Sequence, residues 1–214
     1  MLKIQSFTFN PLSENTYVVS DETKQCAIID CGAYNSEEQD ILYNYIKDEQ
    51  LNPVALLSTH GHFDHNLGTA FAAEQYNLTL QLHNRDQALY EQMDEQLRQL
   101  GGTSWITLKK VTPAYFDDDF KISIGNHLFE IIPTPGHTKG SVCFYCQEEK
   151  ALFSGDTLFQ GTIGRTDLPF GSMFQMTNSL RRLCQLPDEV QVYPGHGPQT
   201  SIALELSSNP FLDR

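Results

Sequence analysis

STHGHFDHNLG, residues 58–68, places three imidazoles and one carboxylate within six positions, as His60, His62, Asp64 and His65. Ordinary polar loops do not concentrate metal-type ligands in this way. Residues 53–57, just before, predict a short buried strand, and residues 67–76, just after, carry apolar side chains at helical spacing. The ligands therefore follow a strand end, where sheets covered by helices collect ligands. We interpret the stretch as part of a site that the rest of the chain completes.

Four other candidate residues also follow predicted strands and have a glycine within two positions. Glycine lets the backbone turn sharply and approach its neighbours closely. Taken singly, each has an ordinary alternative, a surface histidine or a turn aspartate. The four are His137 in PGHT, Asp156 in SGDT, His196 in PGHG and Asp30 in IIDCG.

The first half of the chain alternates strand and helix signals. Residues 2–9, 16–20 and 26–29 predict an antiparallel meander. A helix should begin at Ser36, with Gln39 at the capping-box spacing. After the histidine cluster we expect a strand at residues 79–82 and a helix that carries apolar positions from 88 to 100 and stops at Gly101-Gly102.

The second half begins with predicted strands, and predicted helices follow them. The expected elements are strands at 120–124, 128–132, 141–146, 151–154 and 190–193, a helix at about 173–185, and a short helix before Asn209-Pro210. Two mixed sheets facing each other, with helices outside both, would bury these elements. The predicted fold class is therefore α+β (α/β).

Composition excludes several classes of protein. The 214 residues carry a net charge of −13, which disfavours nucleic acid as a partner. No apolar run reaches the roughly 20 residues of a membrane span, and the N-terminus lacks a signal-peptide core, so we expect a cytoplasmic protein that does not enter a membrane. Five cysteines, an odd number, do not indicate a disulfide framework; Cys143 and Cys146 should point to opposite faces of one strand.

THGHFDHNLG, PGHT, SGDTLF and PGHG, in this order, resemble the metallo-β-lactamase superfamily, and within it the glyoxalase II branch. The resemblance implies an αββα four-layer sandwich, with residues 1–214 as one metallo-β-lactamase-like domain. Full-length glyoxalase II adds a helical C-terminal domain that binds glutathione. Here the chain ends 18 residues after His196, at Arg214. The sequence is therefore more similar to short, single-domain glyoxalase II-like (hydroxyacylglutathione hydrolase-like) hydrolases.

The resemblance implies two divalent metal ions. His60, His62 and His137 would hold the first ion, Asp64, His65 and His196 the second, and Asp156 would bridge both. The residues themselves agree, because His60 and His62, two apart, share one side of an extended chain. Imidazoles with carboxylates suit Zn best, with Fe or Mn possible. Asp30 is the candidate for orienting a ligand histidine and fixing its tautomer, and Thr59 and Thr138 are further candidates.

The implied activity is that of a dinuclear hydrolase, in which a metal-bound hydroxide attacks a small-molecule thioester such as an S-acylglutathione. Asp64 and Asp156 would be its catalytic carboxylates. Arg165 stands near the place where glyoxalase II has a basic residue that contacts glutathione, although a surface ion pair is an ordinary alternative. The aromatic residue that follows there is Asp167 here.

Two other functions remain open from the sequence. Persulfide (sulfur) dioxygenases of the same superfamily use one mononuclear iron, and they share the segment Gly164-Arg165-Thr166-Asp167. The third reading is a binding protein in which the metals are structural. The true substrate, the native metal and the oligomeric state do not follow from the sequence.

Overall fold

The computed structural model describes residues 1–99 and 108–212, and two mixed six-stranded sheets organise them. The first sheet has the order β1-β2-β3-β4-β5-β6. Its strands are β1 (Lys3–Phe9), β2 (Glu14–Ser20), β3 (Gln25–Ile29), β4 (Asn52–Leu57), β5 (Leu80–His83) and β6 (Ala114–Phe116). The first three strands form the expected antiparallel meander, and β3 to β6 run parallel.

The second sheet has the order β14-β13-β10-β9-β8-β7. Its strands are β7 (Lys121–Ile124), β8 (His127–Pro133), β9 (Val142–Cys146), β10 (Ala151–Gly155), β13 (Gln191–Pro194) and β14 (Thr200–Ser201). Only the β10–β13 pair is parallel. A small hairpin of β11 (Leu158–Phe159) and β12 (Thr162–Ile163) follows β10.

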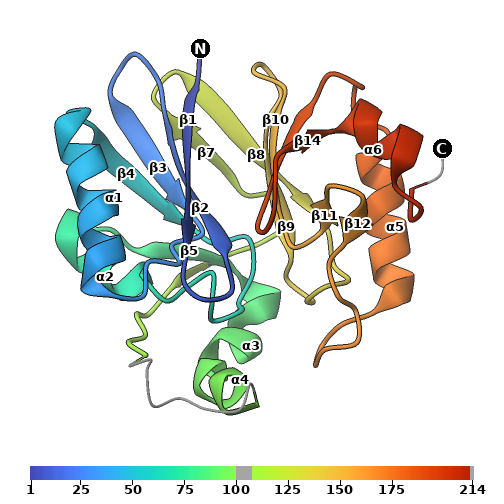
Figure 1. The fold of residues 1–214 in the computed structure, drawn as a ribbon, viewed down its shortest axis with the longest axis horizontal. Coiled ribbons are helices and arrows are strands. Elements are labelled where there is room, and N and C mark those ends of the chain that lie inside the picture. Colours follow the sequence, from blue (N-terminus) through green and yellow to red (C-terminus); the bar gives the residue numbers. More distant parts are fainter. Residues whose placement is uncertain (100–107, 213–214) are drawn as a thin grey trace.

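Helices cover the outer faces of both sheets, as Figure 1 shows for α1 and α2 on one side and α5 and α6 on the other. The helices are α1 (Ser36–Asp48), α2 (Thr69–Tyr76), α3 (Gln87–Glu91), α4 (Met93–Gln99), α5 (Met173–Leu183) and α6 (Ile202–Ser208), and the single 3-10 turn η1 (Asn84–Asp86) precedes α3. The layers thus run helix, sheet, sheet, helix. The expected αββα four-layer sandwich is confirmed.

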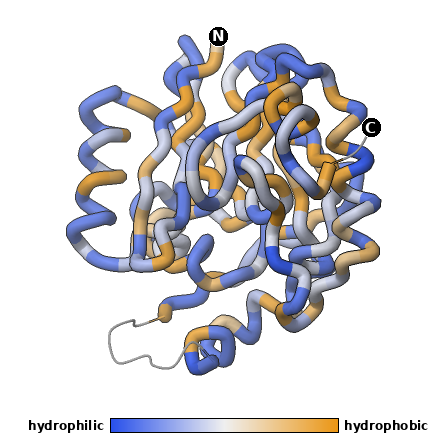
Figure 2. Tube along the Cα trace, turned by 45° about the vertical axis from the view of Figure 1, so that its right-hand side comes forward, coloured by the Kyte–Doolittle hydropathy of each residue, from blue (hydrophilic) through white to orange (hydrophobic). Residues whose placement is uncertain are grey.

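Three apolar layers separate these four layers of structure. Val18 and Ile28 pack toward the first pair of helices, whereas their neighbours Val19 and Ile29 pack between the sheets. The second sheet alternates in the same way, and Leu152 faces α5 and α6. Both faces of the central strands are buried, which explains their nearly continuous apolar sequences. In Figure 2 hydrophobic residues accordingly gather in the strands between the helical layers.

The cysteines follow the same alternation. Cys143 belongs to the apolar layer under α5, and Cys146 belongs to the layer between the sheets, so the two thiols face opposite ways as expected. All five cysteines are buried. None of the helices among residues 1–99 and 108–212 has both the length and the apolarity that crossing a membrane requires.

Two helix predictions need correction. The cap of α1 is Asn35, whose side chain accepts a hydrogen bond from the Glu38 N–H, and Ser36 is already helical. Asparagine is as good a cap as serine, and the helix cap lies one residue before the predicted one. The helix expected after β5 is broken at Gln92 into α3 and α4. Its expected stop at Gly101-Gly102 lies outside the described residues.

Candidate metal centre

Strand register brings the predicted site residues to one edge of the sandwich. Ile29 of β3 pairs with Leu57 of β4, so that Asp30 lies beside Thr59 and accepts its N–H at 2.7 Å. In the second sheet, Gly155 of β10 pairs with Pro194 of β13, which sets Asp156 next to Gly195. A Cβ on Gly195 would collide with the Asp156 carboxylate and the His65 ring, so only glycine permits this approach.

All seven predicted ligands meet at this edge. Two trios have their ligand atoms within 4.8 Å of one another: His60, His62 and His137 form the first trio, and Asp64, His65 and His196 form the second. Asp156 lies between them. Its Oδ1 is 3.3 Å from His65 Nε2, and its Oδ2 is 3.3 Å from His137 Nε2 and 3.7 Å from His196 Nε2.

Two histidines of the first trio, His60 and His137, take their ring orientations from partners outside it. His137 Nδ1 lies 2.7 Å from the Arg165 carbonyl oxygen, which can only accept, so Nδ1 carries the hydrogen and Nε2 keeps its lone pair. Thr59 donates its hydroxyl to Asp30 and accepts from His60 Nδ1 at 3.0 Å. His62 points its Nδ1 at His137 Nε2, 2.8 Å away.

The second trio is oriented by the same principle. His65 Nδ1 is 3.1 Å from Asp30 Oδ2, and His196 Nδ1 is 3.1 Å from the Leu12 carbonyl oxygen. Both imidazoles therefore turn Nε2 toward Asp64 and Asp156. Partners that hold one nitrogen and so expose the other are the usual second layer around metal-binding histidines.

Burial and charge make this edge suited to a cation. His60 is fully buried, and its Nε2 has no hydrogen-bond partner among the described residues. Burial and the neighbouring His137 lower the pKa of His62 to about 3, so this imidazole is neutral and able to ligate at neutral pH. Burial acts to lower the pKa of His65, but Asp156, Asp64 and Asp30 outweigh it and raise that pKa well above its ordinary value. A surplus of carboxylate charge thus favours positive charge at the second trio. The residues present therefore fit a pair of divalent ions.

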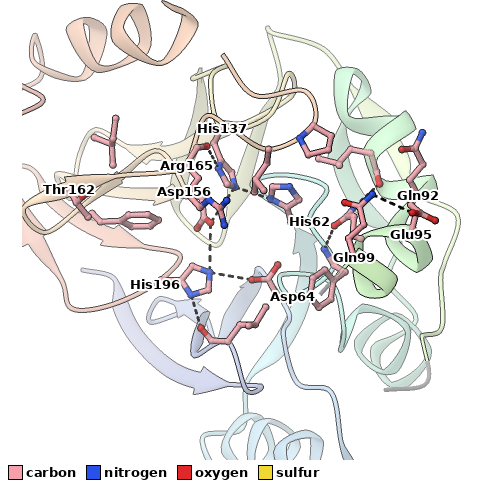
Figure 3. A pocket seen from close by; sticks show the side chains of 18 residues that line it. His62, Asp64, Gln92, Glu95, Gln99, His137, Asp156, Thr162, Arg165 and His196 are labelled. Atoms are coloured by element: carbon pink, nitrogen blue, oxygen red, sulfur yellow. Dashed lines mark hydrogen bonds and ion pairs between the residues drawn. The ribbon is translucent and has the colours of Figure 1, made fainter. Parts of the chain in front are cut away.

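A pocket of about 690 Å³ opens over the two trios. Figure 3 shows His62, Asp64, His137, Asp156 and His196 turned toward one another at one side, with the polar side chains of Gln92 and of α4 on the facing wall. Those polar residues are Gln92, Glu95 and Gln99. The β11–β12 hairpin and the segment after it supply apolar lining residues, which are Phe159, Ile163, Leu168 and Pro169. A pocket of this size and mixed lining suits a small organic substrate.

Arg165 lines the pocket, but its guanidinium is engaged. Nε and Nη2 donate to the two carboxylate oxygens of Asp167 at 3.0 and 2.8 Å, a bidentate pair at an exposed position. The sequence had left open a substrate contact and a surface ion pair, and in this structure the ion pair is formed. The backbone carbonyl of Arg165, rather than its side chain, touches a predicted ligand.

Several contacts of the site lie outside the sequence predictions. The Thr138 side chain hydrogen-bonds to no histidine among the described residues; its hydroxyl donates to Asp86, which also accepts the Gly61 N–H. Gln96 of α4 accepts from the Phe63 N–H and donates to the Gly61 carbonyl, because the break at Gln92 turns α4 toward the histidine loop. Of these, only Asp86 had a detectable signal, since it follows the end of a parallel strand.

Comparison with known proteins identifies similar chains of matching length. The model of the metallo-beta-lactamase superfamily matches residues 9–196. The hydroxyacylglutathione hydrolase GloC of Haemophilus influenzae is 35% identical over 216 residues, covering 99% of each chain. The crystal structure of TTHA1623 in a di-iron-bound form is 37% identical with a TM-score of 0.86, covering 97% of this chain and all of that one. BLEG-1, a B3 metallo-beta-lactamase, is 35% identical with a TM-score of 0.86 and full coverage of both chains.

Proposed function

The chain belongs to the metallo-β-lactamase superfamily, and from that premise we propose that it is a dinuclear metal-dependent hydrolase acting on a small-molecule thioester. The similar chains include a hydroxyacylglutathione hydrolase and a B3 metallo-beta-lactamase at equal identity, so family membership alone does not select the substrate. The substrate assignment favours the thioester because the motif set is that of the glyoxalase II branch.

One observation carries the proposal. Four imidazoles give their Nδ1 hydrogens to fixed partners and turn Nε2 to the centre, where His62 Nδ1 and two carboxylates join them. In our assignment His60, His62 and His137 would hold one ion and Asp64, His65 and His196 the other, with Asp156 placed between the two trios. The set of nitrogen and oxygen ligands favours Zn, and the di-iron form of TTHA1623 makes iron the first alternative. Divalent ions held there would polarise a carbonyl oxygen and lower the pKa of a water.

The protein's own groups complete the reaction. Asp64 and Asp156 are the two carboxylates of the centre that line the pocket, so each can accept the proton that an attacking water gives up as the new C–O bond forms. The C–S bond then breaks and the thiolate leaves. The pocket over the centre, lined by α4 and the β11–β12 hairpin, gives the thiolate a path out.

The test loads the purified chain with Zn, Mn or Fe and compares three substrates. We expect S-lactoylglutathione or another small acyl thioester to be hydrolysed, two ions to bind per chain, and Asp156→Ala to abolish turnover. Oxygen uptake with glutathione persulfide and one bound iron would instead identify a dioxygenase. If the loaded chain hydrolysed a chromogenic cephalosporin and left the thioesters uncleaved, the substrate would be a β-lactam instead of a thioester. Full turnover by the loaded Asp156→Ala variant would refute the assigned role of Asp156.

A further inference from the structure

Asp86 is a buried carboxylate that belongs to neither trio. It ends η1, directly after β5, and is only 1% exposed. Its Oδ2 accepts the Gly61 N–H at 2.8 Å and the Thr138 hydroxyl at 2.7 Å, and its Oδ1 accepts the Gly140 N–H at 2.7 Å. A carboxylate with three donors is well satisfied in a buried place, so its position is tightly defined.

The partners of Asp86 lie on two different loops. Gly61 stands between His60 and His62 in the loop after β4 of the first sheet. Thr138 follows His137 in the loop after β8 of the second sheet. Gly140 packs so closely on Asp86 that a Cβ there would strike its backbone nitrogen and carboxyl carbon. One carboxylate therefore joins the two segments that together supply the whole first trio.

Among residues 1–99 and 108–212, no hydrogen bond joins Asp86 to a member of the second trio. Its aspartate and two histidines take their contacts from Asp30, the Leu12 and Ser13 carbonyls and Asn10, which donates to the Asp64 carbonyl. Building on the metal-binding role proposed above, we propose that Asp86 is a positioning residue that sets the distance between the His60–His62 loop and His137. It thereby sets the affinity of the first trio for its ion and leaves the second trio unaffected.

The experiment measures Zn²⁺ affinity by competition with a chromophoric chelator, in two backgrounds that isolate the positions. His196→Ala weakens the second trio, and His137→Ala weakens the first. Adding Asp86→Asn to the His196→Ala protein should lower the remaining Zn²⁺ affinity by about 10- to 100-fold, as for other residues that orient metal ligands. Adding it to the His137→Ala protein should change the affinity by less than about 3-fold, because the three hydrogen bonds of Asp86 go to Gly61, Thr138 and Gly140 and to no member of the second trio.

A matched control is Glu205→Gln. Glu205 is also fully buried and accepts three hydrogen bonds, from Thr200, Gly161 and Asn209, but it touches neither ligand loop. It should leave Zn²⁺ affinity unchanged in both backgrounds. If Asp86→Asn prevents folding, Thr138→Val removes one of the three bonds and should lower affinity several-fold in the His196→Ala background only.

Other results would overturn the proposal about Asp86 or the proposed function. An equal fall in both backgrounds would mean that Asp86 acts through general structure or charge, and no fall in either would mean that it does not position the trio; both outcomes overturn the proposal. If the wild-type chain failed to bind two ions, the proposed function itself would fail. Binding of two ions by the wild type with no effect of Asp86→Asn would refute only the inference about Asp86.

Discussion

Asp30 Oδ2 lies 3.1 Å from His65 Nδ1, and both side chains are almost completely buried. The same carboxylate accepts the N–H and the hydroxyl of Thr59 at 2.7 Å each, so it cannot turn away from the histidine. His65 is thereby fixed with Nε2 toward Asp156.

Asp30→Asn should weaken metal binding by the second trio. An amide nitrogen cannot accept from His65 Nδ1, so the ring loses its fixed tautomer, and the affinity for the second ion should fall by about 10- to 100-fold. Titrating each protein with Zn²⁺ and measuring its thioesterase activity at each ratio of Zn²⁺ to protein checks this prediction. Asp40→Asn, at an exposed position of α1, is the control and should change neither value. Unchanged affinity in Asp30→Asn would show that the contact does not support ligation.

The ion pair between Arg165 and Asp167 predicts how the KM for anionic substrates depends on these two residues. Because Asp167 occupies the Nε–Nη2 edge of the guanidinium, Arg165→Ala should raise KM for an anionic thioester by less than about 3-fold, as for other exposed pairs. Asp167→Asn frees the guanidinium and should lower that KM several-fold.

Steady-state kinetics with one anionic and one neutral thioester separate these effects. The neutral substrate should respond to neither substitution, which makes it the internal control. A large rise of KM in Arg165→Ala, with no gain in Asp167→Asn, would mean that substrate displaces Asp167 in the wild type.

Local signals marked five of the seven predicted ligands, because each follows a strand and stands next to a glycine: His60, His62, His137, Asp156 and His196. His60 and His196 follow β4 and β13, which belong to different sheets, and the facing of the two sheets follows from strands that are apolar on both faces. The pattern of strands and helices therefore predicted the four layers, whereas the set of seven ligands came from the resemblance to the metallo-β-lactamase superfamily.

What the sequence did not predict depends on distant partners. Asp86 accepts from residues 25, 52 and 54 positions away, and no local pattern encodes such contacts. The break at Gln92 goes with the contacts of Gln96 to Gly61 and Phe63, which lie more than 30 positions away and are not visible in continuous helical spacing. The strands β11, β12 and β14 have two residues each, too few to show alternation.

Removal of divalent ions should destabilise the chain as well as inactivate it. Without ions, neutral buried imidazoles such as His60 keep an unpartnered nitrogen, and the carboxylates of the centre repel one another. Ion binding to the folded state at 100 times its Kd would contribute about 2.7 kcal/mol. Thermal unfolding with chelator and after Zn²⁺ addition measures the difference. His83→Gln, outside the centre, should keep the same shift, and an equal Tm with and without ions would contradict binding to the folded state.

The hydrogen bonds of Asp21 predict how the folded state loses stability at acid pH. It follows β2, and its buried carboxylate accepts from Thr23 and from the Asn126 N–H in the β7–β8 turn of the other sheet. Burial acts to raise its pKa, but these hydrogen bonds outweigh it and lower the pKa to about 2. A lowered pKa in the folded state adds stability above the unfolded value of about 3.9, and that stability is lost as the pH falls toward 2.

Asp21→Asn should therefore be less stable than the wild type by roughly 2 kcal/mol at pH 7, and this difference should shrink between pH 4 and pH 2. Urea unfolding at several pH values gives the difference directly, because the other carboxylates titrate in both proteins. Asp119→Asn, at an exposed turn, should track the wild type throughout. If the stability difference between Asp21→Asn and the wild type stayed constant down to pH 2, the hydrogen bonds across the sheets would not be what lowers the pKa of Asp21.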